Sequence, residues 1–383
     1  MIAGTLAGAL EFLRARRDRL LSSPAFQRAS TAFLLTRPVA RASSRELFDL
    51  VAGFVYSQVL LATIRLRLLD RVAEGPRTGA ELAIATGMPR ERLQHLLQAA
   101  VALRLLQQRG PRSEADAPRY GLGFLGAALR GNPGVAAMVD HHALLYGDLA
   151  DPIALLRDRD RRTALARFWA YAQAPEPGEL DDESVAPYTR LMSSSQQFIC
   201  DEVLAAYPFG RHRHLLDIGG GDGTFAAEAA RRHPRLSVTL VDLPPVARAA
   251  RARFEQAGIG SRAVAIGSDF RVDPLPTGAD LVTLVRVVHD HDDDIVARVL
   301  RSARTAIRDD GVLLVAEPMA AQAGAKALSD AYFSMYLLAM GSGKPRDPDA
   351  LRALLRDAGF REIRVHATRN PLLLGLISAR PAT

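Results

Sequence analysis

Cysteine and tryptophan are almost absent from this chain of 383 residues, which contains one of each. The single cysteine, Cys200, excludes an internal disulfide and any metal site built from several thiolates. Free cysteines without a reactive role behave as small buried apolar residues. We therefore expect Cys200 to be buried in a helix that covers residues 196–205.

Lysine is also scarce, although the formal net charge is +7. Lys326 and Lys344 are the only lysines, so arginine supplies nearly all of the positive charge. Because a GC-rich coding sequence would produce the same preference, the charge is weak support for nucleic-acid binding. The hydrophobic fraction of 48% and the charged fraction of 24% suit a globular protein long enough for two or three domains.

The sequence also lacks a long apolar run and a cleavable leader. No stretch approaches the roughly 18 apolar residues of a membrane span, and the signal-peptide order of charged, apolar and small residues is missing. These features predict a cytoplasmic protein. Residues 1–40 nevertheless alternate leucine and phenylalanine clusters with Arg14, Arg16, Arg17 and Arg19. This pattern is typical either of a basic helix on the inner or intracytoplasmic membrane surface or of a helix packed on a partner.

The most informative segment that is present is HLLDIGGGDGTF at 214–225. An apolar strand ends in Asp217 and leads into a turn that contains Gly219 and Gly221, after which a helix begins near Thr224. Glycine lets the backbone approach a ligand closely, and the helix directs its N–H groups and its positive end to the same place. The segment therefore predicts a binding site for a nucleoside-containing cofactor.

Two adenosyl cofactors compete for this turn. The nicotinamide fingerprint is G-x-G-x-x-G, but Thr224 stands where its third glycine belongs. Asp217 would repel a pyrophosphate, whereas it would suit the ammonium group of S-adenosylmethionine. The next predicted strand, 237–241, ends in Asp242, where a carboxylate can accept both ribose hydroxyls. We favour S-adenosylmethionine and keep a nicotinamide enzyme as the alternative.

Strand and helix patterns alternate downstream, which predicts a doubly wound α/β domain. Asp269 and Phe270 follow the third predicted strand, where an acid can bind the adenine amino group and an aromatic ring can cover the base. The predicted strands are 263–266, 281–288 and 312–316, and the predicted helices are 246–256 and 295–307.

The last two apolar segments, 361–367 and 372–378, lie too close together for a parallel crossover, which needs about a dozen residues. They are therefore predicted to pair antiparallel. A terminal antiparallel hairpin on an otherwise parallel sheet is the topology of class I methyltransferases, and it counts against a nicotinamide enzyme.

The N-terminal part predicts a winged helix. Residues 78–108 contain two short helices joined at 87–89, and a strand and turn follow through 120–122. A DNA-binding regulator is therefore a second possible class, but the helix at 90–106 offers few side chains that could read base edges. We favour dimerisation and no nucleic-acid partner. The predicted organisation is an extension 1–44, a mostly α winged-helix dimerisation domain 45–135, a helical substrate-binding linker 136–208 interrupted by a loop at 175–187, and a cofactor-binding domain 209–383.

The fourth predicted strand runs into LVRVVHDHDDD at 284–294, which places His289 at the carboxyl edge of the sheet. A histidine there can take a proton at neutral pH. Glu317, at the end of the fifth strand, can hold the histidine tautomer. The acids at 290–294 cap the following helix rather than bind a metal, because metal-ligand spacing is missing.

Six motifs resemble the plant-type O-methyltransferases related to caffeic acid and hydroxyindole methyltransferases, over residues 45–383. The motifs are LLDIGGGDGTF at 215–225, VDLP at 241–244, SDF at 268–270, VVHDH at 287–291, VAEP at 315–318 and DAGF at 357–360. The resemblance implies a homodimer, S-adenosylmethionine as cofactor, His289 as general base and Glu317 as its orienting acid. The candidate cofactor residues are then Asp217, Gly219, Gly221, Asp242, Leu243, Asp269, Phe270 and Arg286.

Two positions depart from that family pattern. The His-Asp-Trp triplet of the family reads His289-Asp290-His291 here, and Pro345 stands where a second glutamate often flanks the base.

A narrower resemblance is to the carotenoid O-methyltransferases of purple bacteria, of the hydroxyneurosporene or demethylspheroidene type. It lies in long stretches at 46–70, 141–152, 166–171 and 332–343. It implies methylation of the tertiary 1-hydroxyl of an acyclic carotenoid, with a polyketide phenol or a bacteriochlorophyll intermediate as alternative acceptors. Aromatic and methionine side chains suit a long polyene. The candidate substrate-binding residues are Phe168, Trp169, Met192, Phe333, Tyr336 and Met340.

Overall fold

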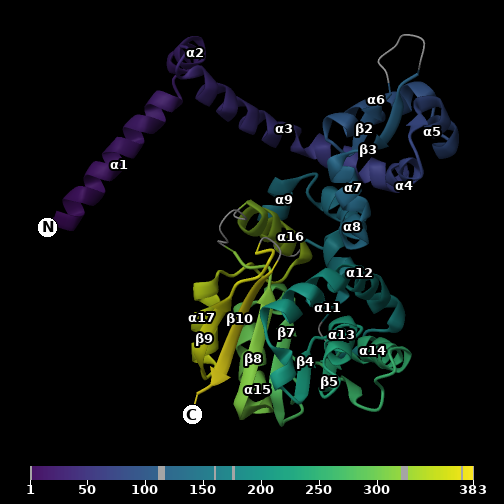
Figure 1. The fold of residues 1–383 in the computed structure, drawn as a ribbon. Helices are drawn as coiled ribbons and strands as arrows, with labels where there is room; N and C mark the ends of the chain where they lie inside the picture. Colours follow the sequence, from purple (N-terminus) through teal and green to yellow (C-terminus); the bar gives the residue numbers. More distant parts are fainter. Residues whose placement is uncertain are drawn as a thin grey trace. The chain divides into compact units, whose positions relative to one another are not determined.

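The computed structural model describes six stretches of the chain, residues 2–110, 117–158, 161–174, 177–320, 327–371 and 374–382. Lys326 and the first residues of the predicted loop 175–187 and strand 372–378 lie outside them. The fold divides into two compact units, Met1–Ala128 and Leu129–Thr383 (Figure 1). The finer domain boundaries given above stay predictions.

The first unit begins with three consecutive helices, α1 (Ile2–Leu21), α2 (Pro24–Ala32) and α3 (Arg37–Arg65). Ser23 caps α2, because its hydroxyl accepts the Phe26 N–H at 3.4 Å, and Pro24 fills the first helical position, where no N–H is needed. Side chains from Gly8 to Leu50 are exposed or half-buried, and none is buried.

One expectation about this region is wrong. The sequence predicted no stretch suited to a membrane span, yet α3 is long and apolar enough to cross a membrane, with a mean hydropathy of 1.7 over 18 residues. Residues 50–64 contain no charged side chain. Gly53, Tyr56 and Ser57 interrupt the apolar run while leaving its mean hydropathy high. Core helices pass the same test of length and composition, so the finding by itself is weak evidence of a span.

The rest of the first unit has the predicted winged-helix architecture. Its antiparallel sheet has the order β1-β3-β2. Thr78 and Glu81 form a reciprocal capping box at the start of α5, and Gly87 ends that helix with φ 67°. The elements are α4 (Leu68–Ala73), β1 (Arg77–Thr78), α5 (Gly79–Thr86), α6 (Arg90–Ala102), β2 (Leu106–Arg109), β3 (Arg119–Leu122) and α7 (Phe124–Arg130).

Helices precede the sheet of the second unit, and polar side chains cap the starts of all of them except α11. These helices are α8 (Pro133–Asp148), α9 (Pro152–Arg157), α10 (Ala164–Phe168), α11 (Ala170–Gln173) and α12 (Asp182–Ala206). The predicted interruption is too long at its C-terminal end, because α12 begins at Asp182 and contains Pro187. Asp181 accepts the Ser184 N–H at 2.8 Å and so starts the helix before the proline. Cys200 is fully buried in α12, as expected.

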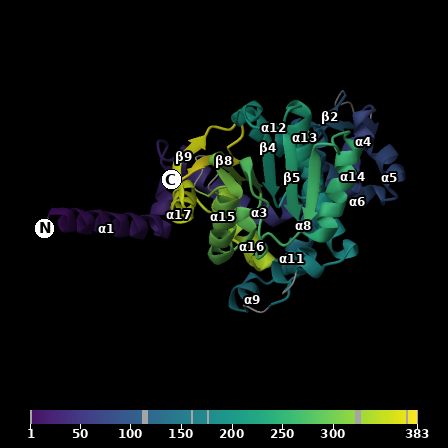
Figure 2. The same cartoon turned by 90° about the horizontal axis from the view of Figure 1, so that it is seen from below.

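A seven-stranded sheet of order β6-β5-β4-β7-β8-β10-β9 forms the centre of the second unit (Figures 1 and 2). The strands from β6 to β8 run parallel, whereas β10 pairs antiparallel with both β8 and β9. The terminal hairpin is therefore confirmed. The strands are β4 (His214–Ile218), β5 (Ser237–Asp242), β6 (Ala263–Gly267), β7 (Ala279–Val285), β8 (Ile307–Glu317), β9 (Phe360–His366) and β10 (Gly375–Pro381).

Helices cover both faces of this sheet, because alternate strand residues face opposite sides. On β4, Leu215 packs with α12, α13 (Thr224–Arg232) and α14 (Pro244–Gln256). The next residue, Leu216, packs with α15 (Asp293–Ala306) and α17 (Pro348–Asp357). A third apolar cluster joins α8, α10, α12 and α16 (Phe333–Met340).

Several predicted boundaries in this unit are wrong, since β8 begins before residue 312 and β10 runs over Gly375–Pro381 rather than 372–378. The strand predicted at 281–288 ends at Val285, because Arg286 adopts a left-handed conformation with φ 60° and a short turn follows at Val288–Asp290. His289 therefore lies on a turn beyond the strand. Ile307, predicted as the last helical residue, begins β8 instead.

Candidate active site

The glycine turn after β4 brings the backbone against a cavity. Gly219 and Gly221 have φ values of 66° and 62°, which favour glycine. A Cβ atom on Gly219 would lie 2.7 Å from a methyl group of Val287, whereas one on Gly221 would meet no heavy atom within 4 Å. Gly221 therefore faces open space in the cavity wall, and both glycines line the cavity.

Asp242 lies at the end of β5, directly beside this turn. Its Oδ2 accepts the Gly221 N–H at 2.8 Å and its Oδ1 accepts the Leu243 N–H at 2.7 Å. Burial raises the pKa of the carboxyl to about 6, although both backbone bonds oppose the rise. A carboxylate oxygen can accept two hydrogen bonds, so each oxygen retains a lone pair for hydroxyl donors. Leu243 lines the same cavity.

Asp217 is buried and does not line this cavity. Its Oδ1 accepts the Thr283 hydroxyl at 2.6 Å, while Oδ2 has no hydrogen-bond partner in the part of the chain that the structure describes. Burial raises the pKa of Asp217 to about 7. A Cβ atom on Gly220 would lie 2.5 Å from Oδ2, so the side chain fills the space beneath the glycine turn.

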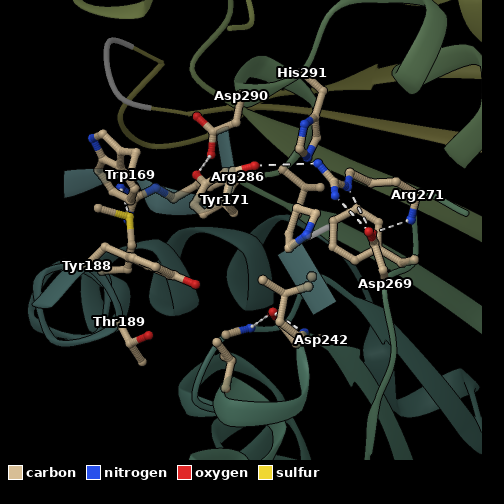
Figure 3. A pocket seen from close by; sticks show the side chains of 18 of the residues that line it. Trp169, Tyr171, Tyr188, Thr189, Asp242, Asp269, Arg271, Arg286, Asp290 and His291 are labelled. Atoms are coloured by element: carbon tan, nitrogen blue, oxygen red, sulfur yellow. Dashed lines mark hydrogen bonds and ion pairs between the residues drawn. The ribbon is translucent and has the colours of Figure 1, made fainter. Parts of the chain in front are cut away.

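Asp269 and Phe270 also line the cavity, and Figure 3 shows how the acid faces Arg271. The Arg271 guanidinium donates to both oxygens of Asp269, at 2.8 Å and 2.7 Å. The predicted adenine-binding acid is therefore already paired. The ring of His291 lies edge-on to that of Phe270, with centroids 5.9 Å apart, and burial lowers the pKa of the imidazole.

Arg286 places a cation in the wall of the cavity. Its guanidinium donates to the Ser195 hydroxyl at 2.8 Å and to the Met192 sulfur at 3.1 Å, both on α12. These acceptors are neutral, and burial lowers the pKa of the guanidinium even though Asp290 and Glu317 favour its charge. A carboxylate on a bound molecule would therefore be a suitable partner.

The geometry fits S-adenosylmethionine. Asp242 provides acceptors for ribose hydroxyls, Gly221 provides open backbone, and Arg286 provides a cation for the methionyl carboxylate. The Tyr188 hydroxyl has no hydrogen-bond partner among the described residues, and Figure 3 shows it pointing into the cavity. Seven of the eight predicted cofactor residues line the cavity, namely Gly219, Gly221, Asp242, Leu243, Asp269, Phe270 and Arg286.

His289 lies between two carboxylates. Its Nδ1 is 2.6 Å from Glu317 Oε2, and its Nε2 is 3.1 Å from Asp290 Oδ1. Burial alone would lower the pKa of His289, but the two carboxylates raise it above its ordinary value. The other oxygen of Asp290 accepts the Tyr171 hydroxyl at 2.8 Å. His289 can act as a base only when its proton is lost and an acceptor hydroxyl replaces Asp290 at Nε2.

Glu317 binds two backbone groups in addition to orienting the imidazole. Its Oε1 accepts the backbone N–H groups of Val287 and Val288, at 2.9 Å and 2.6 Å. The same carboxylate therefore holds the turn that carries His289. Because Glu317 is 2% exposed, these donors would have no water to replace it.

The predicted substrate residues divide into two groups. Trp169 and Met192 line the cavity, and the ring of Phe333 lies edge-on to that of His289, with centroids 6.2 Å apart. Tyr336 and Met340 are buried in the third apolar cluster and do not line the cavity.

Hydrogen bonds hold Tyr336 in that cluster. Its hydroxyl lies 2.8 Å from His141 Nε2 and accepts the Trp169 indole N–H at 2.8 Å. Phe168 packs on His141, with ring centroids 4.3 Å apart, and also does not line the cavity. Tyr336, His141 and Phe168 therefore pack behind Trp169 and do not form the surface of the cavity.

Sequence reasoning missed Tyr171 and Asp290 as members of the site. Asp290 follows His289 directly, and that adjacency was a usable signal. Tyr171 comes from α11, far away in the chain, and although it lies in the stretch 166–171 of the narrower resemblance, nothing in that pattern indicates a contact with Asp290. Within the described residues, no group of three or more His, Cys, Asp and Glu side chains is arranged to hold a metal ion.

Comparisons with known proteins define the class. Residues 146–361 match the O-methyltransferase domain, and residues 48–129 match the O-methyltransferase dimerisation domain. The chain therefore belongs to the O-methyltransferase family, and it is an enzyme that uses S-adenosylmethionine as methyl donor.

Individual relatives are similar over nearly the whole chain. The chain is 41% identical to demethylspheroidene O-methyltransferase of Cereibacter sphaeroides, over 95% of this chain and 94% of that protein. It is 39% identical to the enzyme of the same name from Rhodobacter capsulatus, over 90% and 84%. Among solved structures, the mitomycin 7-O-methyltransferase superposes with a TM-score of 0.72 at 27% identity, covering 90% of this chain and 100% of that one.

Proposed function

We propose that this protein methylates the tertiary 1-hydroxyl group of an acyclic hydroxycarotenoid, as in spheroidene or spirilloxanthin biosynthesis. The observation that carries the proposal is the identity of 41% and 39% to two proteins named demethylspheroidene O-methyltransferase. Both alignments cover more than four fifths of each chain.

The surroundings of His289 support an apolar acceptor. Phe333 packs edge-on to the imidazole, while Trp169, Tyr171 and Tyr188 form an aromatic group with ring centroids 5.2 to 5.9 Å apart. Aromatic side chains offer large apolar contact areas of defined shape. They would hold a polyene end beside the base without requiring a polar group on the acceptor other than its hydroxyl.

The residues of the site would mainly orient the acceptor. S-Adenosylmethionine, when bound, supplies a methyl group already activated on a sulfonium. Alignment of the reacting atoms can contribute about 7 to 11 kcal/mol, whereas a general base contributes about 10² to 10⁴-fold. A tertiary alcohol is a weak acid, so its proton leaves late. His289 then removes that proton, and Glu317 stabilises the imidazolium that results.

A direct assay tests the proposed substrate. The purified enzyme with S-adenosylmethionine should convert a 1-hydroxy acyclic carotenoid in detergent micelles to its methyl ether, detected by mass spectrometry. A carotenoid of the same length without the hydroxyl is the matched control. Efficient methylation of a polyketide phenol or a bacteriochlorophyll intermediate, with no product from the hydroxycarotenoid, would reject the proposal.

A further inference from the structure

The first 47 residues lie outside both family matches, the earlier of which begins at residue 48. Residues 1–45, which we call the arm, contain eight arginines and two acids, for a net charge of +6. The whole chain has a net charge of +7. Nearly all of the excess positive charge is therefore concentrated in the arm, and the rest of the chain is close to neutral.

The arm also exposes its large apolar side chains. Nine of them have half or more of their surface exposed, and these nine occur in α1, in the segment between α2 and α3, and at the start of α3. They are Leu10, Phe12, Leu13, Leu20, Leu21, Phe33, Leu34, Leu35 and Val39. Exposed apolar groups in this density mark an interaction surface.

Helix geometry places the acids of α1 opposite two of its leucines. At 100° per residue, Leu13 and Leu20 share one face, while Glu11 and Asp18 share the opposite face. Arg17 projects near the leucine face. Long arginine side chains can lay their methylene groups on apolar material and keep the guanidinium at its polar boundary.

The two acids do not cancel the attraction of the arm for an anionic surface. Arg14 lies 3.5 Å from Glu11 and Arg17 lies 2.7 Å from Asp18, and all four side chains are more than 60% exposed. Exposed ion pairs of this kind contribute little free energy. They can exchange for other anionic partners at small cost.

We propose that the arm docks on the surface of a bilayer that contains anionic lipids. Its leucine and phenylalanine side chains enter the boundary between headgroups and acyl chains, and its arginines bind lipid phosphates. The protein would then be a peripheral protein on the cytoplasmic side of a membrane. A second copy of the arm is a poorer occupant, because two segments of charge +6 repel each other.

Vesicle sedimentation tests this surface with the full chain. We expect binding to vesicles of phosphatidylglycerol and phosphatidylcholine, weaker binding to phosphatidylcholine alone, and release as salt screens the charge. Replacing Arg14, Arg16, Arg17 and Arg19 by glutamine should lower the partition coefficient at least about tenfold.

A matched variant controls for net charge. Glutamine at Arg235, Arg298, Arg301 and Arg356, four exposed arginines of the second unit, removes the same charge elsewhere and should leave vesicle binding within about twofold of the unmodified protein. A further variant, Leu13→Ser with Leu20→Ser, keeps every charge and should also weaken binding. Calorimetric binding of S-adenosylhomocysteine verifies that each variant is folded.

Four outcomes would overturn the proposal. The first is that the unmodified protein does not bind the vesicles, and the second is that the arm and control variants lose vesicle binding equally. The third is that the protein stays with the vesicles in alkaline carbonate, which would show that α3 spans the bilayer. The fourth is that the arm substitutions dissociate a dimer without changing vesicle binding. The vesicles contain no carotenoid, so the result is independent of the proposed substrate.

Discussion

The imidazole of His289 is held from both sides, and this arrangement determines how the residue can work. With Glu317 at Nδ1 and Asp290 at Nε2, the protonated ring is favoured and its pKa is raised. The acceptor must therefore compete with Asp290 for Nε2. Tyr171 assists that exchange, because its hydroxyl already binds the other oxygen of Asp290.

Replacing the base should reduce turnover but not cofactor binding. We expect His289→Ala to lower kcat for the hydroxycarotenoid about 10²-fold, at the lower end of the general-base range, because a weakly acidic alcohol gains little from an imidazole. The affinity for S-adenosylhomocysteine, measured by calorimetry, should stay within about twofold, a difference of about 0.4 kcal/mol. Full activity in this variant would remove His289 from the mechanism.

Two variants should move the acid limb of the pH profile in opposite directions. His289 is active when neutral, so kcat/KM rises as the pH passes upward through its raised pKa. Asp290→Asn removes one stabilising carboxylate, lowers that pKa and shifts the limb to lower pH. Tyr171→Phe leaves Asp290 free to bind the imidazolium, so the limb should shift to higher pH. Shifts in the same direction would contradict the idea that His289 and Tyr171 compete for Asp290.

Asp242 should make cofactor affinity depend on pH. Its pKa is raised to about 6, so the carboxylate that accepts hydroxyl donors is lost as the pH falls through that value. Binding of S-adenosylhomocysteine should weaken below pH 6 and should be much weaker at every pH in Asp242→Ala, since each charge-assisted bond contributes about 1.5 to 3 kcal/mol. An unchanged dissociation constant for this variant would show that the cofactor lies elsewhere.

At the scale of elements, the turn after β7 depends on a side chain from β8. Glu317→Gln can still accept both backbone N–H groups at Oε1, but its amide would donate to His289 Nδ1 and place the ring proton on Nε2. This variant should keep its melting temperature and lose less kcat than the about 10²-fold expected for His289→Ala. Glu317→Ala leaves two buried N–H groups unpaired, at about 1 to 3 kcal/mol each, and should melt several degrees lower. Equal melting temperatures for both variants would contradict the role of Glu317 in the turn.

The regular elements of the second unit were predictable because their patterns are local. Apolar runs and helical spacing gave the parallel strands, and the short gap before the last strand gave the hairpin. The end of β7 was missed because the left-handed conformation of Arg286 has no composition signal. Pro187 was read as an interruption, whereas the cap at Asp181 starts the helix before it.

The site was predictable only where function and local motif coincide. Asp242 ends a strand that the sequence marks, and Gly221 and Phe270 come shortly after two others. Tyr336 and Met340 have the same apolar pattern whether they face a ligand or a core, so sequence could not distinguish these positions. Only the three-dimensional packing shows that Tyr336 binds His141 and Trp169.

For the whole molecule, the dimerisation match predicts a homodimer. Sedimentation velocity of the full chain should give a dimer, and deletion of residues 1–109 should give a monomeric or insoluble protein, because the unit that matches residues 48–129 would be lost. A monomeric full-length protein would contradict the predicted homodimer, and sequence-specific DNA binding that persists at physiological salt would contradict the prediction of no nucleic-acid partner.

The position of β10 has a consequence for the order of folding. Its first residue, Gly375, pairs with Glu317 of β8, and β10 lies between β8 and β9 in the sheet. Until residues 375–381 have left the ribosome, β8 is an unpaired edge, and such edges invite aggregation. The strand that carries Glu317 therefore gains its second neighbour only after β9, which precedes β10 in the chain, has been synthesised.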